Sequence, residues 1–378
     1  MLQAVKEFRV GGPQIFAGLM LLIFLVQCLA TAKTRPLSEL EYQYIAAGMP
    51  DGAGKHVTFS PFTNLVAGLP VRVIHRVRQM APARVSAALA VPRPWLLRLP
   101  FVIFGLWLGG ALWWVARRLF DNEGGYIALG LYCTSPAIIQ ISSNIGPEII
   151  LAWSSLGLVY TAIGVAHTLY APPGKWAPRI MILGLSIGFA LATAWWSVTL
   201  VMLAAGYMLY LAPGCRRKVL VVLGGASAIA CMVWATVAWL TGSAGLAAKA
   251  VFAQKPAFDV LANLAFVFSA NTDGYVLVAL FIVALTAYGS WRRARYFGNT
   301  APLLTAFAAV LLFAFVPAIH IWDATLGLSF VFIFIGGVAA DLLEVRFRGR
   351  LAALFGACLV LRSVLTLIAL SVWVHNSM

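Results

Sequence analysis

The chain has 378 residues, of which 62% are hydrophobic and only 10% are charged. A soluble domain carries about a quarter charged residues, so this composition excludes an ordinary water-soluble fold and indicates a protein that folds in lipid. The net charge of +15 does not indicate a nucleic-acid partner, because most basic residues lie in short clusters between apolar segments, where they orient helices against anionic membrane lipids.

Apolar segments of about twenty residues, the length needed to cross the hydrocarbon core, recur along the chain. The first follows Lys6 and Arg9 and is too long for the apolar core of a cleaved signal peptide, so we interpret it as a membrane span. We predict an all-α integral membrane protein that forms a single polytopic domain over residues 1–378. Its helices, about eleven in number, are predicted at residues 13–31, 97–115, 125–141, 147–169, 180–195, 196–212, 219–241, 273–290, 301–319, 324–340 and 352–374.

Charge decides the one ambiguous segment, residues 180–212, which is too long for one crossing and contains Trp195 and Trp196. A hairpin at this Trp pair places six consecutive basic clusters on one side of the membrane, which the positive-inside rule identifies as the cytoplasm. The N-terminus is then cytoplasmic and the C-terminus extracytoplasmic. The six clusters are Lys6/Arg9, Arg117/Arg118, Lys175/Arg179, Arg216/Arg217/Lys218, Arg292/Arg293/Arg295 and Arg346/Arg348/Arg350.

Two predicted extracytoplasmic segments, residues 32–96 and 242–272, are too long to be turns. In the first, a row of apolar residues recurs at four-residue spacing, with basic residues away from that row. This pattern predicts an amphipathic helix in the headgroup layer, bent at Pro70. The apolar row is Leu65, Leu69, Val73 and Val77.

The first long segment opens with Ser38-Glu39-Leu40-Glu41-Tyr42-Gln43-Tyr44-Ile45-Ala46-Ala47-Gly48-Met49. It is followed, in order, by Phe59-Ser60-Pro61-Phe62, Thr134-Ser135-Pro136 and Gly146-Pro147-Glu148. This series resembles the C-type membrane glycosyltransferases (GT-C fold), which include protein O-mannosyltransferases and lipid A aminoarabinose transferases. Their first loop opens on Asp-Glu-x-x-Tyr-x-x-Ile-Ala-x-x-Met. The resemblance covers residues 10–170 and implies transfer of a sugar from a polyprenyl-phosphate donor to an acceptor on the extracytoplasmic face.

The resemblance also implies an outward-facing carboxylate that acts as general base toward the acceptor. The first acidic position of the family motif corresponds to Ser38, so the base falls to Glu39 first, with Glu148 as a second acid and Glu41 as a further candidate. Each of them has a simpler interpretation. Glu39 and Glu41 are also expected as solvated loop charges, and Glu148 as an acid placed by a helix N-terminus.

Cations near the headgroup level would stabilise the departing lipid phosphate. The candidate phosphate ligands are Arg72 and Arg76 on the amphipathic helix, and Lys249, Lys255 and His320 in later outer segments. His56 and Asp323 are further candidates for the same cavity. Arg362 lies in the middle of the last span, where a charge needs a partner, a polar cavity or another subunit.

The five cysteines form no pair or cluster with histidine, so no metal site is predicted. Some relatives need a divalent cation and others do not, which leaves a cation requirement open. One alternative function is a non-catalytic GT-C-fold subunit of a larger complex, with a partner membrane subunit at the last helix. The other is a transporter or lipid flippase, although the chain shows no repeated halves.

Overall fold

The computed structural model describes residues 11–49, 60–80, 93–242, 274–290, 297–315 and 325–343, and the positions 357, 360–362, 364, 365 and 368. The described residues form helices and no strand, as predicted. The α-helices are α2 (Gly12–Thr34), α3 (Glu39–Ala47), α4 (Pro61–Met80), α6 (Pro94–Cys133), α7 (Pro136–Ser142), α8 (Pro147–Thr168), α9 (Pro173–Thr193), α10 (Val198–Leu211), α11 (Arg216–Thr241), α14 (Gly274–Ser290), α15 (Phe297–Phe315) and α16 (Leu326–Leu343). Two short 3-10 turns, η2 (Trp195–Ser197) and η3 (Pro213–Cys215), flank α10.

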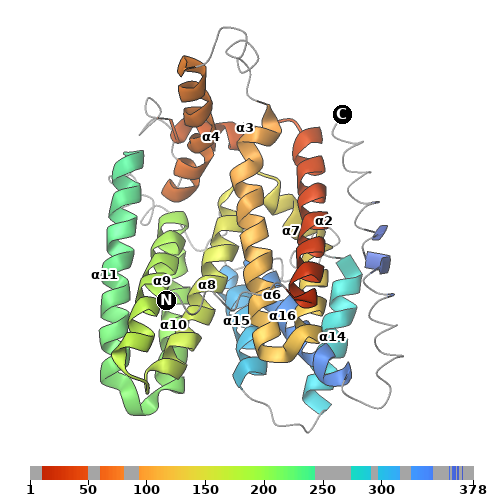
Figure 1. The fold of residues 1–378 in the computed structure, drawn as a ribbon, viewed down its shortest axis with the longest axis vertical. Helices are drawn as coiled ribbons and strands as arrows, with labels where there is room; N and C mark the ends of the chain where they lie inside the picture. Colours follow the sequence, from red (N-terminus) through yellow and green to blue (C-terminus); the bar gives the residue numbers. More distant parts are fainter. Residues whose placement is uncertain are drawn as a thin grey trace.

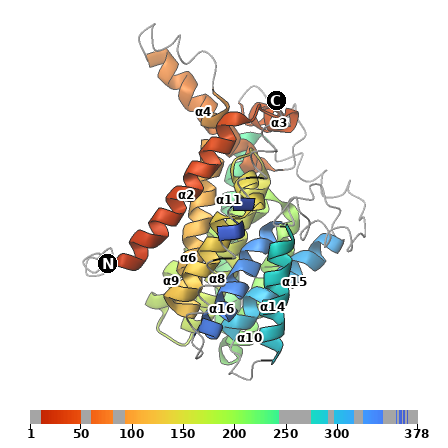
Figure 2. The same cartoon turned by 90° about the vertical axis from the view of Figure 1, so that its right-hand side faces the viewer.

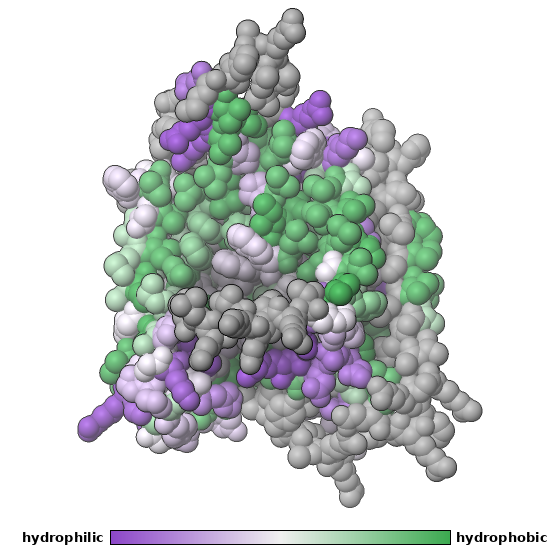
Figure 3. Space-filling view, in the orientation of Figure 1, coloured by the Kyte–Doolittle hydropathy of each residue, from purple (hydrophilic) through white to green (hydrophobic). Residues whose placement is uncertain are grey.

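Most helices run side by side along the long axis, and α3 and α4 lie at one end of the bundle (Figure 1). Among the described helices, six are long and apolar enough to cross a membrane, and the face seen in Figure 3 is broadly apolar. The protein is therefore an integral membrane protein. Helix α2 is inclined to the other helices (Figure 2), and its apolar side chains Ile15, Phe16 and Leu19 are exposed, as expected for a lipid-facing helix. The total of about eleven spans stays a prediction.

Helix α6 contains a reversal at Phe120 and Asp121, where the backbone leaves the helical region and Asp121 has a φ of 59°. The two arms then pack together so closely that a Cβ at Gly125 would lie 3.2 Å from the Cα of Arg117. The predicted spans 97–115 and 125–141 therefore begin in two separate helical arms, and their crossing of the membrane stays a prediction. The second predicted span is interrupted, because Pro136 has no N–H to continue a helix and the chain restarts there as α7.

Helices α9 and α10 are separate and are joined by η2 at the Trp pair, as the charge pattern predicted. At the far end of these helices, Arg179 Nη1 donates to the carbonyl of Gly164 and Lys218 Nζ donates to that of Leu169. Arg118 lines a cavity with Arg179, so three of the predicted basic clusters share one end of the bundle. We call it the basic end and the opposite one the α3–α4 end. The other three clusters lie outside the described residues.

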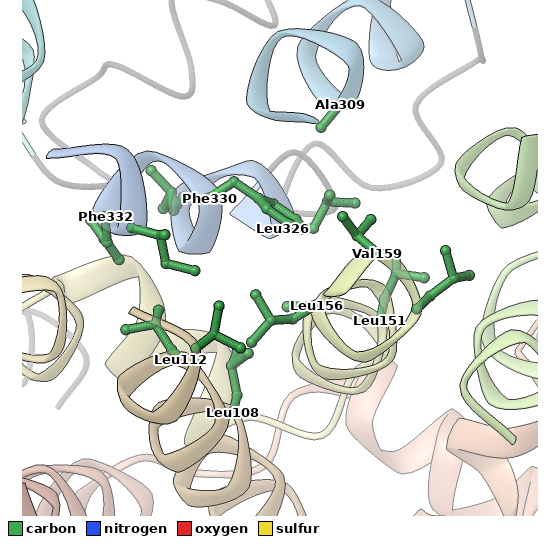
Figure 4. Close-up of a cluster of buried hydrophobic side chains, with 14 of the residues drawn as sticks. Leu108, Leu112, Leu151, Leu156, Val159, Ala309, Leu326, Phe330 and Phe332 are labelled. Carbon is green, nitrogen blue, oxygen red and sulfur yellow. The ribbon is translucent and has the colours of Figure 1, made fainter. Parts of the chain in front are cut away.

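The core lies where α6, α8 and α16 meet, and Figure 4 shows their apolar side chains interdigitated. Helix α16 is buried along nearly its whole length. It approaches α6 closely, since a Cβ at Gly336 would lie 2.7 Å from the carbonyl oxygen of Gly124. Small residues at such crossings are the usual way for helices to associate in lipid, where van der Waals packing replaces the hydrophobic effect.

Candidate active site

Helix α3 begins with a reciprocal pair of hydrogen bonds at Ser38. The Glu41 N–H donates to Ser38 Oγ over 3.2 Å, and the Ser38 N–H donates to Glu41 Oε2 over 2.8 Å. This capping box satisfies two backbone donors that a helix start otherwise leaves unpaired. Ser38, which stands at the first acidic position of the family motif, therefore has a structural role in starting α3.

Glu41 forms a buried, two-pronged ion pair with Arg98 at the start of α6. The Arg98 Nε and Nη2 atoms lie 2.8 and 2.7 Å from the two carboxylate oxygens. The Ile145 N–H, in the turn between α7 and α8, donates to Oε1 over 3.0 Å. Arg98 and Glu41 are only 1% and 4% exposed. The expectation that Glu41 is a solvated loop charge is therefore wrong.

The other Arg98 donors close the C-terminal end of α2. Nη1 donates to the carbonyls of Ala32 and Arg35, and Nη2 to that of Pro36, all within 2.9 Å. The Arg98–Glu41 pair thus fastens α2, α3, α6 and the α7–α8 turn together. Sequence reasoning missed this role, because an arginine near the end of a span looks like an ordinary headgroup anchor.

Glu41 is held in its ionised form. Burial opposes ionisation, but the hydrogen bonds and charge of Arg98, with the N–H groups of Ser38 and Ile145, outweigh it and lower the pKa of Glu41 below its ordinary value. A carboxylate that accepts from all of these donors has little capacity left to accept a proton from a substrate. We therefore assign Glu41 a structural role.

Glu39 and Glu148 are placed differently from Glu41. Glu39 lies two residues before Glu41, about 200° around the helix, and is exposed on the outward side of α3. Glu148 lies in the first turn of α8, half-buried, with its carboxylate folded back against Gly146 and close enough to Glu41 to interact with it electrostatically. The structure thus groups Glu41 with Glu148 and leaves Glu39 facing outward.

Arg35 is a cation of this region that sequence reasoning did not single out. Its Nη1 donates to Asn144 Oδ1 over 2.9 Å, four residues before Glu148. Burial, with the like charge of Arg98, lowers the pKa of Arg35 to about 10 even though Glu41 acts in the other direction. Arg35 therefore stays protonated at neutral pH and places a half-buried positive charge beside the start of α8.

Arg72 and Arg76 both lie on α4, the helix predicted to be amphipathic. Helices α3 and α4 cross with almost no space between them, since a Cβ at Gly48 would lie 2.9 Å from the Gly68 nitrogen. Next to this crossing, Arg72 donates through Nη2 to the Gly48 carbonyl, while its buried Nε has no acceptor among the described residues. Arg76, one turn further on, is exposed. The two candidate phosphate ligands therefore share the α3–α4 end with the carboxylates.

The Trp hairpin lies beside the start of α4. Ser60 Oγ donates to the carbonyl of Thr193, the last residue of α9, over 2.7 Å. Trp195 follows in η2, and its buried indole N–H has no acceptor in the described part of the chain. The hairpin therefore adds an unused donor and an aromatic surface to the same end of the bundle.

Arg362 is 2% exposed, with its guanidinium carbon 5.4 Å from the centre of the Phe332 ring of α16. Its charge is therefore turned toward the interior of the chain. The remaining candidates, His56, Lys249, Lys255, His320 and Asp323, lie outside the described residues. Within the described residues, no group of three His, Cys, Asp or Glu side chains is arranged to hold a metal ion.

A family model described as dolichyl-phosphate-mannose-protein mannosyltransferase matches residues 82–239. The chain is also similar to crystal structures of ArnT from Cupriavidus metallidurans. The apo form matches with a TM-score of 0.62 and 16% identity over 90% of this chain. The form bound to undecaprenyl phosphate matches with a TM-score of 0.64 and 16% identity over 91%. The chain adopts the GT-C fold.

A more distant similarity supports the same fold. The Archaeoglobus fulgidus oligosaccharyltransferase, tethered to an acceptor peptide with the NVT sequon, matches with a TM-score of 0.53 and 12% identity over 92% of this chain. The chain spans 62% and 64% of the two ArnT chains and 54% of the oligosaccharyltransferase. No curated protein matches the chain.

Proposed function

We propose that the chain transfers a sugar from a polyprenyl-phosphate donor to an acceptor at the α3–α4 end of the bundle. The observation that carries this proposal is the fold, which the chain shares over 91% of its length with an ArnT structure that holds undecaprenyl phosphate. The carboxylates and arginines of the α3–α4 end are the groups that such a transfer needs, a base for the acceptor and cations for the phosphate.

The α3–α4 end is proposed to face the extracytoplasmic side. Arg118, Arg179 and Lys218 lie together at the opposite end, and the positive-inside rule favours the cytoplasm for such an end. The N-terminus would then be cytoplasmic and the C-terminus extracytoplasmic. This orientation puts the proposed chemistry on the side where lipid-linked sugars meet secreted or membrane-bound acceptors.

Glu39 is the proposed base. It is exposed and forms no ion pair or hydrogen bond with the described residues, so its oxygens are available to an acceptor hydroxyl. Glu148 is proposed as a second acid, held at the start of α8. Arg72 and Arg76 are proposed to hold the donor phosphate, whose charge grows as the sugar leaves.

The test uses the purified protein in nanodiscs with undecaprenyl-phosphate sugars and follows the release of undecaprenyl phosphate. We expect release by the wild type and a loss of about 100-fold or more in Glu39→Gln, the range for removing a general base. Asp121→Asn is the matched control, since it removes an exposed acid at the basic end while keeping the size and shape of the side chain. Transfer that survives in both Glu39→Gln and Glu148→Gln would refute the mechanism.

Further variants test the phosphate site. Arg72→Gln and Arg76→Gln should raise the KM for the donor. Substitutions of Lys249, Lys255 and His320 belong to the same series, because these residues are also predicted to bind the donor phosphate. The donor should also compete with added undecaprenyl phosphate in the wild type. A donor KM that no member of the series alters would place the phosphate elsewhere.

A non-catalytic membrane subunit is the second candidate, and Ser38 favours it. Its hydroxyl caps α3 at the position where the family motif has an acid. A partner is proposed to contact the last helix, where Leu361, Val364 and Leu365 are exposed. The absence of release with every donor, together with a stoichiometric partner that co-purifies and is lost on polar substitution of those three residues, would establish this function instead.

A further inference from the structure

A cavity of about 790 Å³ opens at the basic end of the bundle, far from the proposed active site. It lies between α6, α8 and α9, and Ala301 of α15 closes one side. Two of its lining side chains, Trp114 and Ile182, are also 60% and 54% exposed on the surface of the bundle. The cavity therefore opens sideways, toward the lipid, at the level where a span meets its headgroup layer.

Basic side chains line the part of the cavity nearest the end of the bundle. Arg118 and His167 are both exposed there. Arg179 is half-buried and is oriented by Nη1, which donates to the Gly164 carbonyl over 2.7 Å and to Thr168 Oγ1 over 3.3 Å. Within the described residues no acidic side chain lines the cavity, and the remaining donors of Arg179 form no hydrogen bond. The mouth is thus built to accept an anion.

A polar group also lies deeper in the same cavity. The buried hydroxyl of Tyr160 has no hydrogen-bond partner among the described residues, and the Tyr160 ring stacks on Phe330 with 6.1 Å between centroids. Tyr160 is one helical turn before Gly164 on α8, so its hydroxyl lies on the core side of the Arg179 guanidinium. Apolar side chains such as Val115 and Leu119 fill the wall between them.

The cavity has cations at its mouth, one hydroxyl further in that is unpaired within the described residues, and apolar side chains where it opens to the membrane. This order matches the order of chemical groups along a phospholipid. A phospholipid has a phosphate, then ester carbonyls, then acyl chains. Figure 3 shows the same order on the surface, with hydrophilic side chains along the lower edge below a broad apolar area. A free phosphate would use the arginines and leave the hydroxyl and the lateral opening unused.

We propose that this cavity binds the headgroup of an anionic phospholipid from the leaflet at the basic end. Arg118 and Arg179 pair with the phosphate, Tyr160 donates to an ester carbonyl, and the acyl chains leave past Trp114 and Ile182. Basic pockets between membrane helices are a known kind of site for such lipids. The bound lipid would fasten α6, α8 and α9 together at the end opposite Arg98.

The test is native mass spectrometry of the full chain in mild detergent, titrated with phosphatidylglycerol or with phosphatidylcholine. We expect saturable binding of one phosphatidylglycerol and weaker binding of phosphatidylcholine. Each arginine is expected to contribute about fivefold to affinity, so Arg118→Gln/Arg179→Gln should bind about 25-fold more weakly. Arg216→Gln/Arg217→Gln is the matched control, because it removes two exposed charges from the same end but outside the cavity.

A single variant separates binding from folding. Arg118 is exposed and forms no hydrogen bond with the described residues, so Arg118→Gln should leave the thermal midpoint unchanged and still weaken binding about fivefold. Equal weakening in the Arg216/Arg217 control would overturn the proposal in favour of general attraction to the basic end. If glycerol 3-phosphate raised the thermal midpoint as much as phosphatidylglycerol does, the proposal would be overturned in favour of a site for a soluble phosphate. If an equimolar amount of undecaprenyl phosphate displaced phosphatidylglycerol, it would be overturned in favour of a site for the donor lipid.

Discussion

Replacing Arg98 by methionine is expected to be among the most destabilising single changes at the α3–α4 end. Arg98 donates two hydrogen bonds to Glu41 and three to the carbonyls that end α2. Methionine fills much of the same volume but carries neither charge nor donors. Arg98→Met therefore leaves the Glu41 carboxylate buried and without its cation, and leaves three carbonyls without their donor.

The loss of stability in Arg98→Met follows from the Glu41 carboxylate that stays buried without its cation. Removing one partner of a buried ion pair costs about 3–5 kcal/mol, because the other partner stays desolvated and uncompensated. Replacing both partners by apolar residues costs much less, since no charge is then left buried. We therefore expect Glu41→Met/Arg98→Met to be more stable than Arg98→Met alone, although the double variant also loses the capping bond from the Ser38 N–H to the Glu41 carboxylate.

Thermal unfolding of the purified protein, followed by intrinsic tryptophan fluorescence in detergent, measures this prediction. Arg98→Met should lower the midpoint by about 6–10 °C, because each kcal/mol lost lowers it by about 2 °C. Arg93→Met is the control, since Arg93 is exposed five residues earlier and its loss should cost less than about 0.5 kcal/mol. The reasoning is refuted if Arg98→Met unfolds like Arg93→Met, or if the double variant unfolds at a lower temperature than the single one.

Three further predictions rest on other parts of the structure. The pKa of Glu41 is lowered in the folded state, so its contribution to stability is present above the ordinary pKa of 4.5 and is lost as pH falls through the folded value. As the pH is lowered from 4.5, the thermal midpoint of the wild type should therefore fall more steeply than that of Glu41→Gln. Gly68→Ala should cost about 1–3 kcal/mol and impair transfer, because its Cβ would lie 2.8 Å from the Gly48 carbonyl carbon; a midpoint equal to that of Gly18→Ala, where nothing lies within 4 Å, would contradict the close crossing. In a variant that keeps Cys215 as its one cysteine, a membrane-impermeant maleimide should label inverted vesicles and spare right-side-out ones, and the opposite result would reverse the proposed orientation.

Much of the bundle could be predicted from the sequence, because its two strongest signals, hydropathy and basic clusters, can each be found in short local segments of the chain. Hydropathy locates spans, and basic clusters assign their ends, so the hairpin at Trp195 and Trp196 followed from charge. The four-residue apolar spacing was enough to predict α4. The reversal at Phe120 and Asp121 falls between the two predicted spans, but its form could not be predicted, since it depends on one residue with positive φ inside an otherwise helical segment.

The arrangement of the site could not be predicted in the same way. Arg98 and Glu41 are 57 residues apart, and neither residue carries a local pattern that names its partner. Glu41 was instead interpreted as a solvated loop charge, because charged residues usually lie in water, and Arg98 was not singled out. Only tertiary packing brings the start of α6, the end of α2 and the α7–α8 turn around one carboxylate. A buried ion pair of this kind can be recognised from the tertiary structure but not from the sequence alone.

The capping role of Ser38 has a consequence for catalysis. In the family motif the first acid stands at this position, at the start of the helix. Here that position caps α3, and the neighbouring Glu39 lies about 100° further around the helix axis. A base at Glu39 therefore faces the outward side of α3, away from the Arg98–Glu41 pair, and the acceptor must approach from that side. Glu148 lies on the inward side of α3, near Glu41, so the effects of replacing Glu39 and Glu148 on transfer distinguish the two possible positions of the acceptor. An acceptor held on the outward side makes transfer depend on Glu39 alone, whereas dependence on Glu148 alone places the acceptor within the bundle.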